Sequence, residues 1–141
     1  MGLTVGAYVA ERENKAHVPA GADATRDEFN GTWFATYAAG PVSIGYQRGA
    51  VNIEAAAKTL YINEYIGISY KVSDNLSVSY NEAESRKAAD TSDQTQEWDS
   101  ISLSYTVGGM TLGVVQQEVD NATYTSGRTS EETAIQMTVA F

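Results

Sequence analysis

The sequence predicts an all-β fold: a transmembrane antiparallel up-and-down β-barrel to which this chain contributes eight strands. Three observations support this prediction. Apolar residues alternate with small polar ones, short turns alternate with long charged connections, and tyrosines gather toward the ends of strands. The eight strands form either a complete small barrel or part of a larger barrel.

Alternation with a period of two defines the strands, because successive side chains of a strand point to opposite faces. The stretch ISLSYTV (residues 101–107) alternates large apolar residues with Ser and Thr, whereas TWFATYAAG (residues 32–40) is a strand whose faces the pattern does not separate. Together these patterns predict a single domain, residues 1–141, with strands at about 2–12, 29–39, 41–52, 59–72, 75–86, 96–107, 110–120 and 131–141.

The connections between these strands are of two kinds. Short turns at 38–41, 72–75 and 107–110 contain Gly or Asp-Asn, which tolerate the positive φ of tight hairpins. Longer connections near residues 13–29, 53–58, 86–96 and 119–131 carry most of the charge. Outer-membrane barrels have short periplasmic turns and longer extracellular loops, so this asymmetry favours a membrane barrel.

The strand faces also favour a membrane location over a soluble one. The polar face is almost uncharged, being Ser, Thr, Gly, Gln and Ala, whereas a soluble β-sandwich or lipocalin-like binder usually exposes Lys, Glu and Arg. The apolar face carries aromatic residues toward the strand ends, where they would form interfacial girdles: Tyr46, Tyr70, Tyr80, Tyr105 and Phe141. The soluble alternative is therefore the least favoured.

Small side chains on the polar face predict a water-filled lumen. Eight strands make a barrel just wide enough to be filled by side chains, and Ser and Gly would underfill it. This favours part of a larger barrel, although the length of chain per strand also suits a complete small one. The residues expected to face the lumen are Ser43, Gln47, Ser69, Ser77, Ser79, Ser102, Ser104, Thr111, Gln117 and Gln136.

Glu64 conflicts with a lipid-facing wall. In LYINEYIGISY it shares the parity of Ile62 and Ile66, and a carboxylate facing lipid is costly. Two explanations remain open: a β-bulge near Asn63 turns Glu64 inward, or this wall is a subunit interface. The apolar run of each strand is also shorter than a spanning strand requires.

Charged residues near the long connections suggest two further roles. Arg12, Arg48 and Arg86 are candidates for setting the field at a pore mouth. The acidic pairs Asp27–Glu28 and Glu131–Glu132 offer the oxygen ligands that Ca²⁺ prefers. A solvated charged loop is the simpler interpretation of those pairs, so no cofactor is predicted.

Composition excludes several classes of function. The formal net charge is −9, which argues against a nucleic-acid partner. There is no cysteine, and the single histidine, His17, excludes histidine-rich metal chemistry. No nucleophile elbow or phosphate loop occurs, so we predict no enzymatic activity. The N-terminus lacks the features of a signal peptide, so Met1 is expected to start a mature chain or a fragment.

Two stretches resemble the hairpins of Gram-negative general porins, especially those of alphaproteobacteria. They are YIGISYKVSDNLSVSYNEAES (65–85) and DSISLSYTVGGMTLGVVQQEVDN (99–121). The likeness is strongest over residues 60–141 and corresponds to the C-terminal half of a porin. The closing AIQMTVAF resembles the C-terminal assembly signal of outer-membrane barrels in general, carried here by Ile135, Met137, Val139 and Phe141.

The resemblance implies a channel in the Gram-negative outer membrane for passive diffusion of small hydrophilic solutes or ions. Porins of this family are sixteen-stranded trimers, so a homo-oligomer is expected. Outer-membrane lipid, lipopolysaccharide and the barrel-assembly machinery are the other expected partners. A porin's inward-folded constriction loop would lie in the other half or in loop 13–29. The alternative function is a closed eight-stranded scaffold or adhesin that conducts little.

Overall fold

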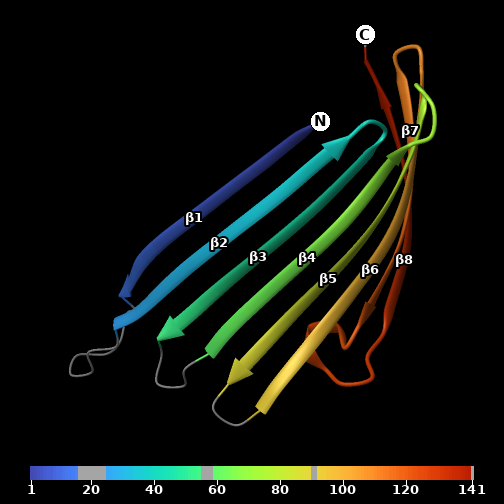
Figure 1. Ribbon diagram of the computed structural model, residues 1–141. Coiled ribbons are helices and arrows are strands. Elements are labelled where there is room, and N and C mark those ends of the chain that lie inside the picture. Colours follow the sequence, from blue (N-terminus) through green and yellow to red (C-terminus); the bar gives the residue numbers. More distant parts are fainter. Residues whose placement is uncertain (16–24, 55–58, 90–91, 141) are drawn as a thin grey trace.

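The computed structural model describes residues 1–15, 25–54, 59–89 and 92–140. They form eight strands in one antiparallel sheet, in the order in which they occur along the chain (Figure 1). The strands are β1 (Gly2–Lys15), β2 (Thr25–Ala39), β3 (Val42–Glu54), β4 (Thr59–Lys71), β5 (Leu76–Ala89), β6 (Ser92–Val107), β7 (Met110–Asp120) and β8 (Ser130–Val139). The eight up-and-down strands predicted from the sequence are confirmed, and most extend further toward the long connections than the alternation indicated.

Three tight turns join the strands at one end of the sheet. Gly40 and Gly108 both have a φ of +58°, a left-handed conformation that glycine adopts without a steric penalty. Gly109 also needs to lack a side chain, because a Cβ there would lie 2.7 Å from the carbonyl oxygen of Ala140. Both chain ends lie at this end, whereas the β7–β8 connection lies at the other (Figure 1).

The β7–β8 connection contains a short 3₁₀ helix, η1 (Ala122–Tyr124). None of the helices in the described ranges is long and apolar enough to cross a membrane.

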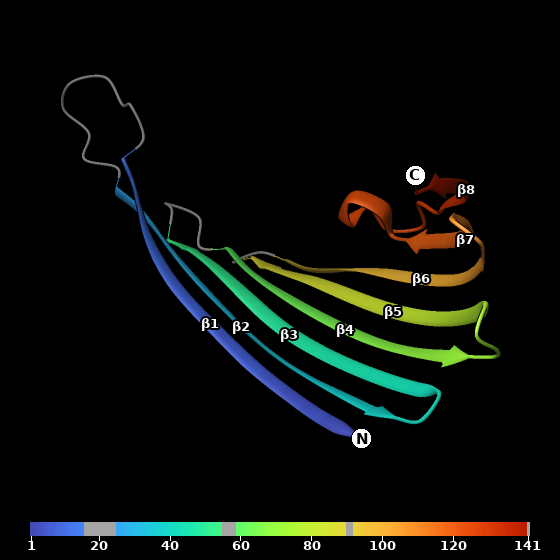
Figure 2. The same cartoon turned by 90° about the horizontal axis from the view of Figure 1, so that it is seen from above.

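The sheet is a single curved layer with two open edges. Figure 2 shows it curving from β1 to β8, with the β7–β8 connection on the concave side. Every inner strand pairs with two neighbours, whereas β1 pairs only with β2 and β8 only with β7 among the described residues. The chain by itself is therefore an open wall, which differs from the closed eight-stranded alternative.

This wall has no hydrophobic core. Its accessible surface is 10002 Å², whereas a compact soluble protein of 15.2 kDa exposes about 7,100 Å². Within the described ranges, Ala122 is the one buried hydrophobic residue. A soluble β-sandwich would bury one face of each sheet against another sheet, so the structure is at odds with the soluble alternative.

Strand pairing is uninterrupted at Glu64. Asn63, Glu64 and Tyr65 pair in step with Gly49, Arg48 and Gln47 on β3. The same three residues pair in step with Ser85, Glu84 and Ala83 on β5. A β-bulge would place two residues opposite one, so the suggestion that a bulge turns Glu64 inward is wrong.

Candidate functional site

The strand register divides the side chains into two faces, because residues directly opposite one another share a face. Tyr124 of η1 lies on the concave side, where its hydroxyl is 2.6 Å from Oγ of Ser85. Because Ser85 faces the concave side, every second residue of β5 counted from Ser85 also faces that side. The strand register then assigns the residues of the other strands to one face or the other. By this parity the concave face holds every predicted lumen residue: Ser43, Gln47, Ser69, Ser77, Ser79, Ser102, Ser104, Thr111, Gln117 and Gln136.

A row of serines crosses the concave face near the short turns. Ser43, Ser69, Ser79 and Ser102 lie directly opposite one another on β3, β4, β5 and β6. The hydroxyl oxygens of Ser79 and Ser102 are 2.6 Å apart and share a hydrogen bond. This row gives the concave face a small, polar and uncharged surface.

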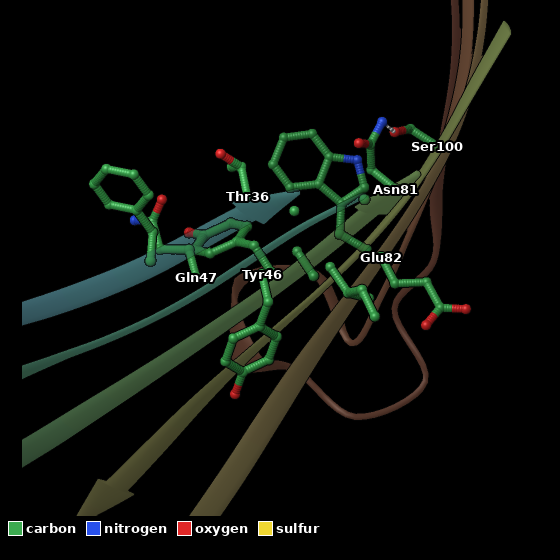
Figure 3. Close-up of a pocket in the computed structure, with 13 residues that line it drawn as sticks. Thr36, Tyr46, Gln47, Asn81, Glu82 and Ser100 are labelled. Carbon is green, nitrogen blue, oxygen red and sulfur yellow. Dashed lines mark hydrogen bonds between the residues drawn. The ribbon is translucent and has the colours of Figure 1, made fainter. Parts of the chain in front are cut away.

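The next row toward the long connections contains two facing glycines. Gly45 of β3 pairs with Gly67 of β4, and Thr36 and Asn81 flank them on β2 and β5. Ser100 of β6 continues the row, and Nδ2 of Asn81 donates a hydrogen bond of 3.3 Å to its Oγ (Figure 3). These residues line a depression of about 470 Å³.

An aromatic row lies beside the glycine row. Phe34, Gln47, Tyr65 and Trp98 come from β2, β3, β4 and β6, with Ala83 of β5 between the last two. Phe34 is 37% exposed, Tyr65 44% and Trp98 41%. The ring of Phe34 lies over Gly6, since a Cβ on Gly6 would come within 2.4 Å of it. Large exposed rings thus interrupt an otherwise small, polar surface.

The β7–β8 connection folds over the concave face. Besides the Ser85 contact, the ring of Tyr124 packs on Tyr61, with ring centres 5.9 Å apart. The backbone N–H of Thr123 donates to the side-chain oxygen of Gln96 at 2.9 Å. Asn121, Thr123 and Tyr124 all have positive φ, a conformation that costs non-glycine residues energy. The side-chain contacts therefore hold a strained segment in place.

The convex face carries an apolar belt near the short turns. Its exposed members come from all eight strands and include Leu3, Tyr37, Ile44, Ile68, Tyr80, Leu103, Leu112 and Met137. On β5 the belt runs only from Leu76 to Tyr80 before Glu82 follows, about 13 Å at 3.3 Å per residue. On β1 it continues through Val9.

Acidic residues border this belt across β4 to β8. Glu64, Glu84 and Glu97 lie opposite one another in one row, and Glu82, Asp99, Glu118 and Glu131 in the next. Glu64 is paired with Arg48, with Nε 3.1 Å from Oε1. The hydroxyl of Tyr80 is 2.8 Å from both Glu82 and Asp99, so its single proton is donated to one carboxylate at a time.

The three predicted pore-mouth arginines lie on different faces. Arg12 of β1 is on the concave face, opposite Glu28 near the long connections. Arg48 and Arg86 are on the convex face, opposite Glu64 and Ile62 respectively. Only Arg12 therefore lies where a residue lining a pore mouth would be expected.

The two acidic pairs considered for Ca²⁺ lie in strands rather than in loops. Asp27–Glu28 belongs to β2 and Glu131–Glu132 to β8. Adjacent strand residues point to opposite faces, so the carboxylates of Glu131 and Glu132 do not converge on one ion. Among the described residues, no group of three or more His, Asp or Glu side chains is arranged to hold a metal.

The predicted assembly signal lies on the outermost strand. Ile135, Met137 and Val139 of β8 share the convex face with Val114, Leu112 and Met110 of β7. Phe141 lies outside the described residues, as do His17 and most of the loop proposed as a constriction, residues 13–29.

Sequence reasoning missed the aromatic row and the inward-folded connection. Trp33 and Phe34 are adjacent and both aromatic, so the alternation in TWFATYAAG does not show which residues share a face. The pairing of β2 with β1 and β3 resolves this. The register places Trp33 on the convex face and Phe34 on the concave face. No sequence pattern indicated the role of Tyr124, because its contacts with Ser85 and Tyr61 join residues that are distant in the sequence.

Comparisons with known proteins show the fold. The chain superposes with a TM-score of 0.77 and 13% identity on a loop L8 deletion mutant of OmpT, an outer membrane protein of Vibrio cholerae. The match covers 96% of this chain and 48% of the OmpT chain, so this chain spans about half the length of that protein. No family model matches the sequence, and no curated protein matches it either.

The fold is thus that of one half of an outer-membrane β-barrel, which confirms the predicted fold class. The membrane location of OmpT agrees with the outer-membrane location predicted from the sequence. The predicted membership of the alphaproteobacterial porins is supported only at the level of an outer-membrane barrel. The absence of enzymatic activity and the partners stay predictions.

Proposed function

We propose that this chain forms half of the wall of a porin-type channel in the outer membrane of a Gram-negative cell. The channel passes small hydrophilic solutes or ions by passive diffusion. The observation that carries this proposal is the separation of the two faces in a wall without a core: Ser, Thr, Gly, Gln and Asn dominate the concave face, and an apolar belt crosses the convex one. A water-filled lumen bounded by lipid requires this arrangement.

The open edges imply that further strands complete the wall. Backbone N–H and C=O groups along the outer edges of β1 and β8 have no strand partner within the described chain. Each unsatisfied group costs several kcal/mol in hydrocarbon, so open sheet edges do not occur there. The additional strands come from the rest of a longer protein or from another copy, and both fit the 48% coverage of OmpT.

The β7–β8 connection narrows the lumen in this proposal. Tyr124 reaches across the concave face to β4 and β5 through Tyr61 and Ser85. A segment held there reduces the cross-section open to solutes. Lys87 adds a positive charge beside it, with Nζ 6.0 Å from the centre of the Tyr124 ring.

Conductance of planar bilayers tests the proposal. The purified protein, with the strands that complete its wall, is folded into detergent, checked for heat-modifiable migration, and added to the bilayer. We expect discrete current steps whose size rises in proportion to salt concentration, as for a water-filled pore. Heat-unfolded protein is the control and should give none. Correctly folded protein that gives no current would overturn the channel and favour the weakly conducting scaffold.

A further inference from the structure

We propose that the depression over Gly45 and Gly67 is a solute-binding subsite of the channel, and that it takes a neutral sugar ring. The inference rests on the proposed channel function and names a class of solute for it. Three features carry it: a floor without side chains, a wall of exposed aromatic rings, and a rim of uncharged hydrogen-bonding groups.

The two facing glycines form the floor. They are directly paired on β3 and β4, and every neighbour in their row carries a side chain. The floor is tight at Gly67, where a Cβ would lie 2.5 Å from Oδ1 of Asn81. At Gly45 the nearest atom to such a Cβ is Cγ2 of Thr36 at 3.5 Å, an ordinary contact. The depression therefore exists because these two positions have no side chains.

Aromatic rings form the wall of the depression. Phe34, Tyr65 and Trp98 all line it, and all three remain more than a third exposed. Exposing large apolar rings to water costs free energy, so a face that only contacts water would not be expected to carry them. They offer flat apolar surfaces on which a ring-shaped solute can stack.

The rim supplies hydrogen bonds without charge. Gln47, Asn81 and Thr36 present amide and hydroxyl groups around the floor, each able to donate and to accept. Ser100 adds a fourth group, already joined to Asn81. The charged residue that borders the depression is Glu82, whose carboxylate lies on the convex face, 2.8 Å from the hydroxyl of Tyr80.

These features select a solute by its chemistry. A sugar ring has C–H faces that pack on aromatic rings and a hydroxyl edge that bonds to planar amides. A volume of about 470 Å³ lies in the range of small-molecule sites, which combine apolar walls with a few placed polar groups. Among the described residues that line the depression, no side chain offers a charged solute an opposite charge on the concave face to offset its lost hydration.

Trp98 provides a direct measurement of binding. The chain has two tryptophans, and Trp33 lies on the convex face, so W33F leaves Trp98 as the reporter inside the depression. W33F protein folded in detergent is titrated with maltotriose, with gluconate as a charged control and benzyl alcohol as a flat aromatic control. We expect saturable change of Trp98 emission with maltotriose and a flat response to gluconate.

Two matched glycine variants test the location. G45V, in the W33F background, fills the floor with a residue that favours strands, and it should weaken maltotriose binding by at least about ten-fold. G113V places the same side chain on the concave face of β7, where a Cβ meets only the carbonyl oxygen of Gln136 at 3.9 Å. It should bind within about two-fold of the parent.

The outcomes separate the subsite from the channel. Current steps in bilayers without saturable maltotriose binding would overturn the subsite and leave the channel standing. Saturable binding lost in G45V, in a protein that carries no current, would support the subsite and overturn the channel. Equal loss of binding in G45V and G113V, or equal affinity for benzyl alcohol and maltotriose, would overturn the proposed site or its preference for sugars.

Discussion

Arg48 and Glu64 form an ion pair on the convex face of the sheet, with Nε of Arg48 3.1 Å from Oε1 of Glu64. They lie directly opposite one another on β3 and β4. Their side chains are 50% and 38% exposed in the isolated chain, and lipid or a protein neighbour would cover them in a membrane. The pair explains how a carboxylate with the parity of Ile62 and Ile66 is tolerated on this face.

Removing Arg48 should therefore destabilise the membrane-embedded protein through Glu64. We expect R48A to lower the free energy of unfolding by about 1 to 2 kcal/mol, because it leaves a carboxylate without its partner where water is scarce. The double variant R48A/E64A should recover part of that loss. Urea titrations of the protein in vesicles give both values. Strictly additive effects of R48A and E64A would show that the two side chains are not coupled.

The same pair shows which features the sequence predicts and which it does not. Alternation alone predicted the strands and assigned residues such as Ser43, Ser79 and Ser102 to one face, because period two is a local property of the backbone. The partner of Glu64 depends on the register between β3 and β4, which alternation does not specify. The sequence accordingly makes Arg48 only a candidate for a pore mouth, whereas the register places it opposite Glu64.

The candidate solute site was less predictable than the fold. Gly45 and Gly67 are 22 positions apart in the sequence, and only strand pairing makes them one floor. Trp98 and Phe34 join them from β6 and β2. Such a site arises from two adjacent rows across five strands, and turn length and register determine which residues share a row, not any local motif.

Leu103 and Ser104 provide a matched test of the two faces, because they are adjacent on β6 and point in opposite directions. L103D puts a carboxylate in the apolar belt and should lower stability in lipid by about 2 kcal/mol. S104D puts the same carboxylate on the concave face and should fold normally. In a channel it should also raise cation selectivity, measured as a shift in reversal potential across a salt gradient. Equal destabilisation by both variants would contradict the assignment of faces.

Tyr124 should control the width of the channel. Y124F removes the hydroxyl that lies 2.6 Å from Ser85 and loosens a segment whose backbone has three positive φ values outside glycine. We expect larger single-channel conductance, because a loosened connection leaves the concave face more of the time. S85A should act in the same direction.

Thr129 supplies the control for that measurement. Its hydroxyl donates to Asp120 at 2.8 Å, at the base of the same connection. T129V therefore removes a hydrogen bond from the segment without touching the contact with the wall. Conductance of T129V should match the parent. An increase in T129V equal to that in Y124F would mean that the segment acts through its overall flexibility and not through Ser85.

The edge strands should be paired once the protein is in a membrane. Within the part of the chain that the structure describes, β1 and β8 each have one strand neighbour, whereas β4 lies between β3 and β5. Backbone groups in hydrocarbon must find partners, so amides of β1 and β8 should exchange with deuterium as slowly as those of β4 in vesicles. In dilute detergent, without the completing strands, half of the edge amides should exchange quickly. Fast exchange confined to β1 and β8 in vesicles as well would mean that the wall stays open, and an open wall does not enclose a pore.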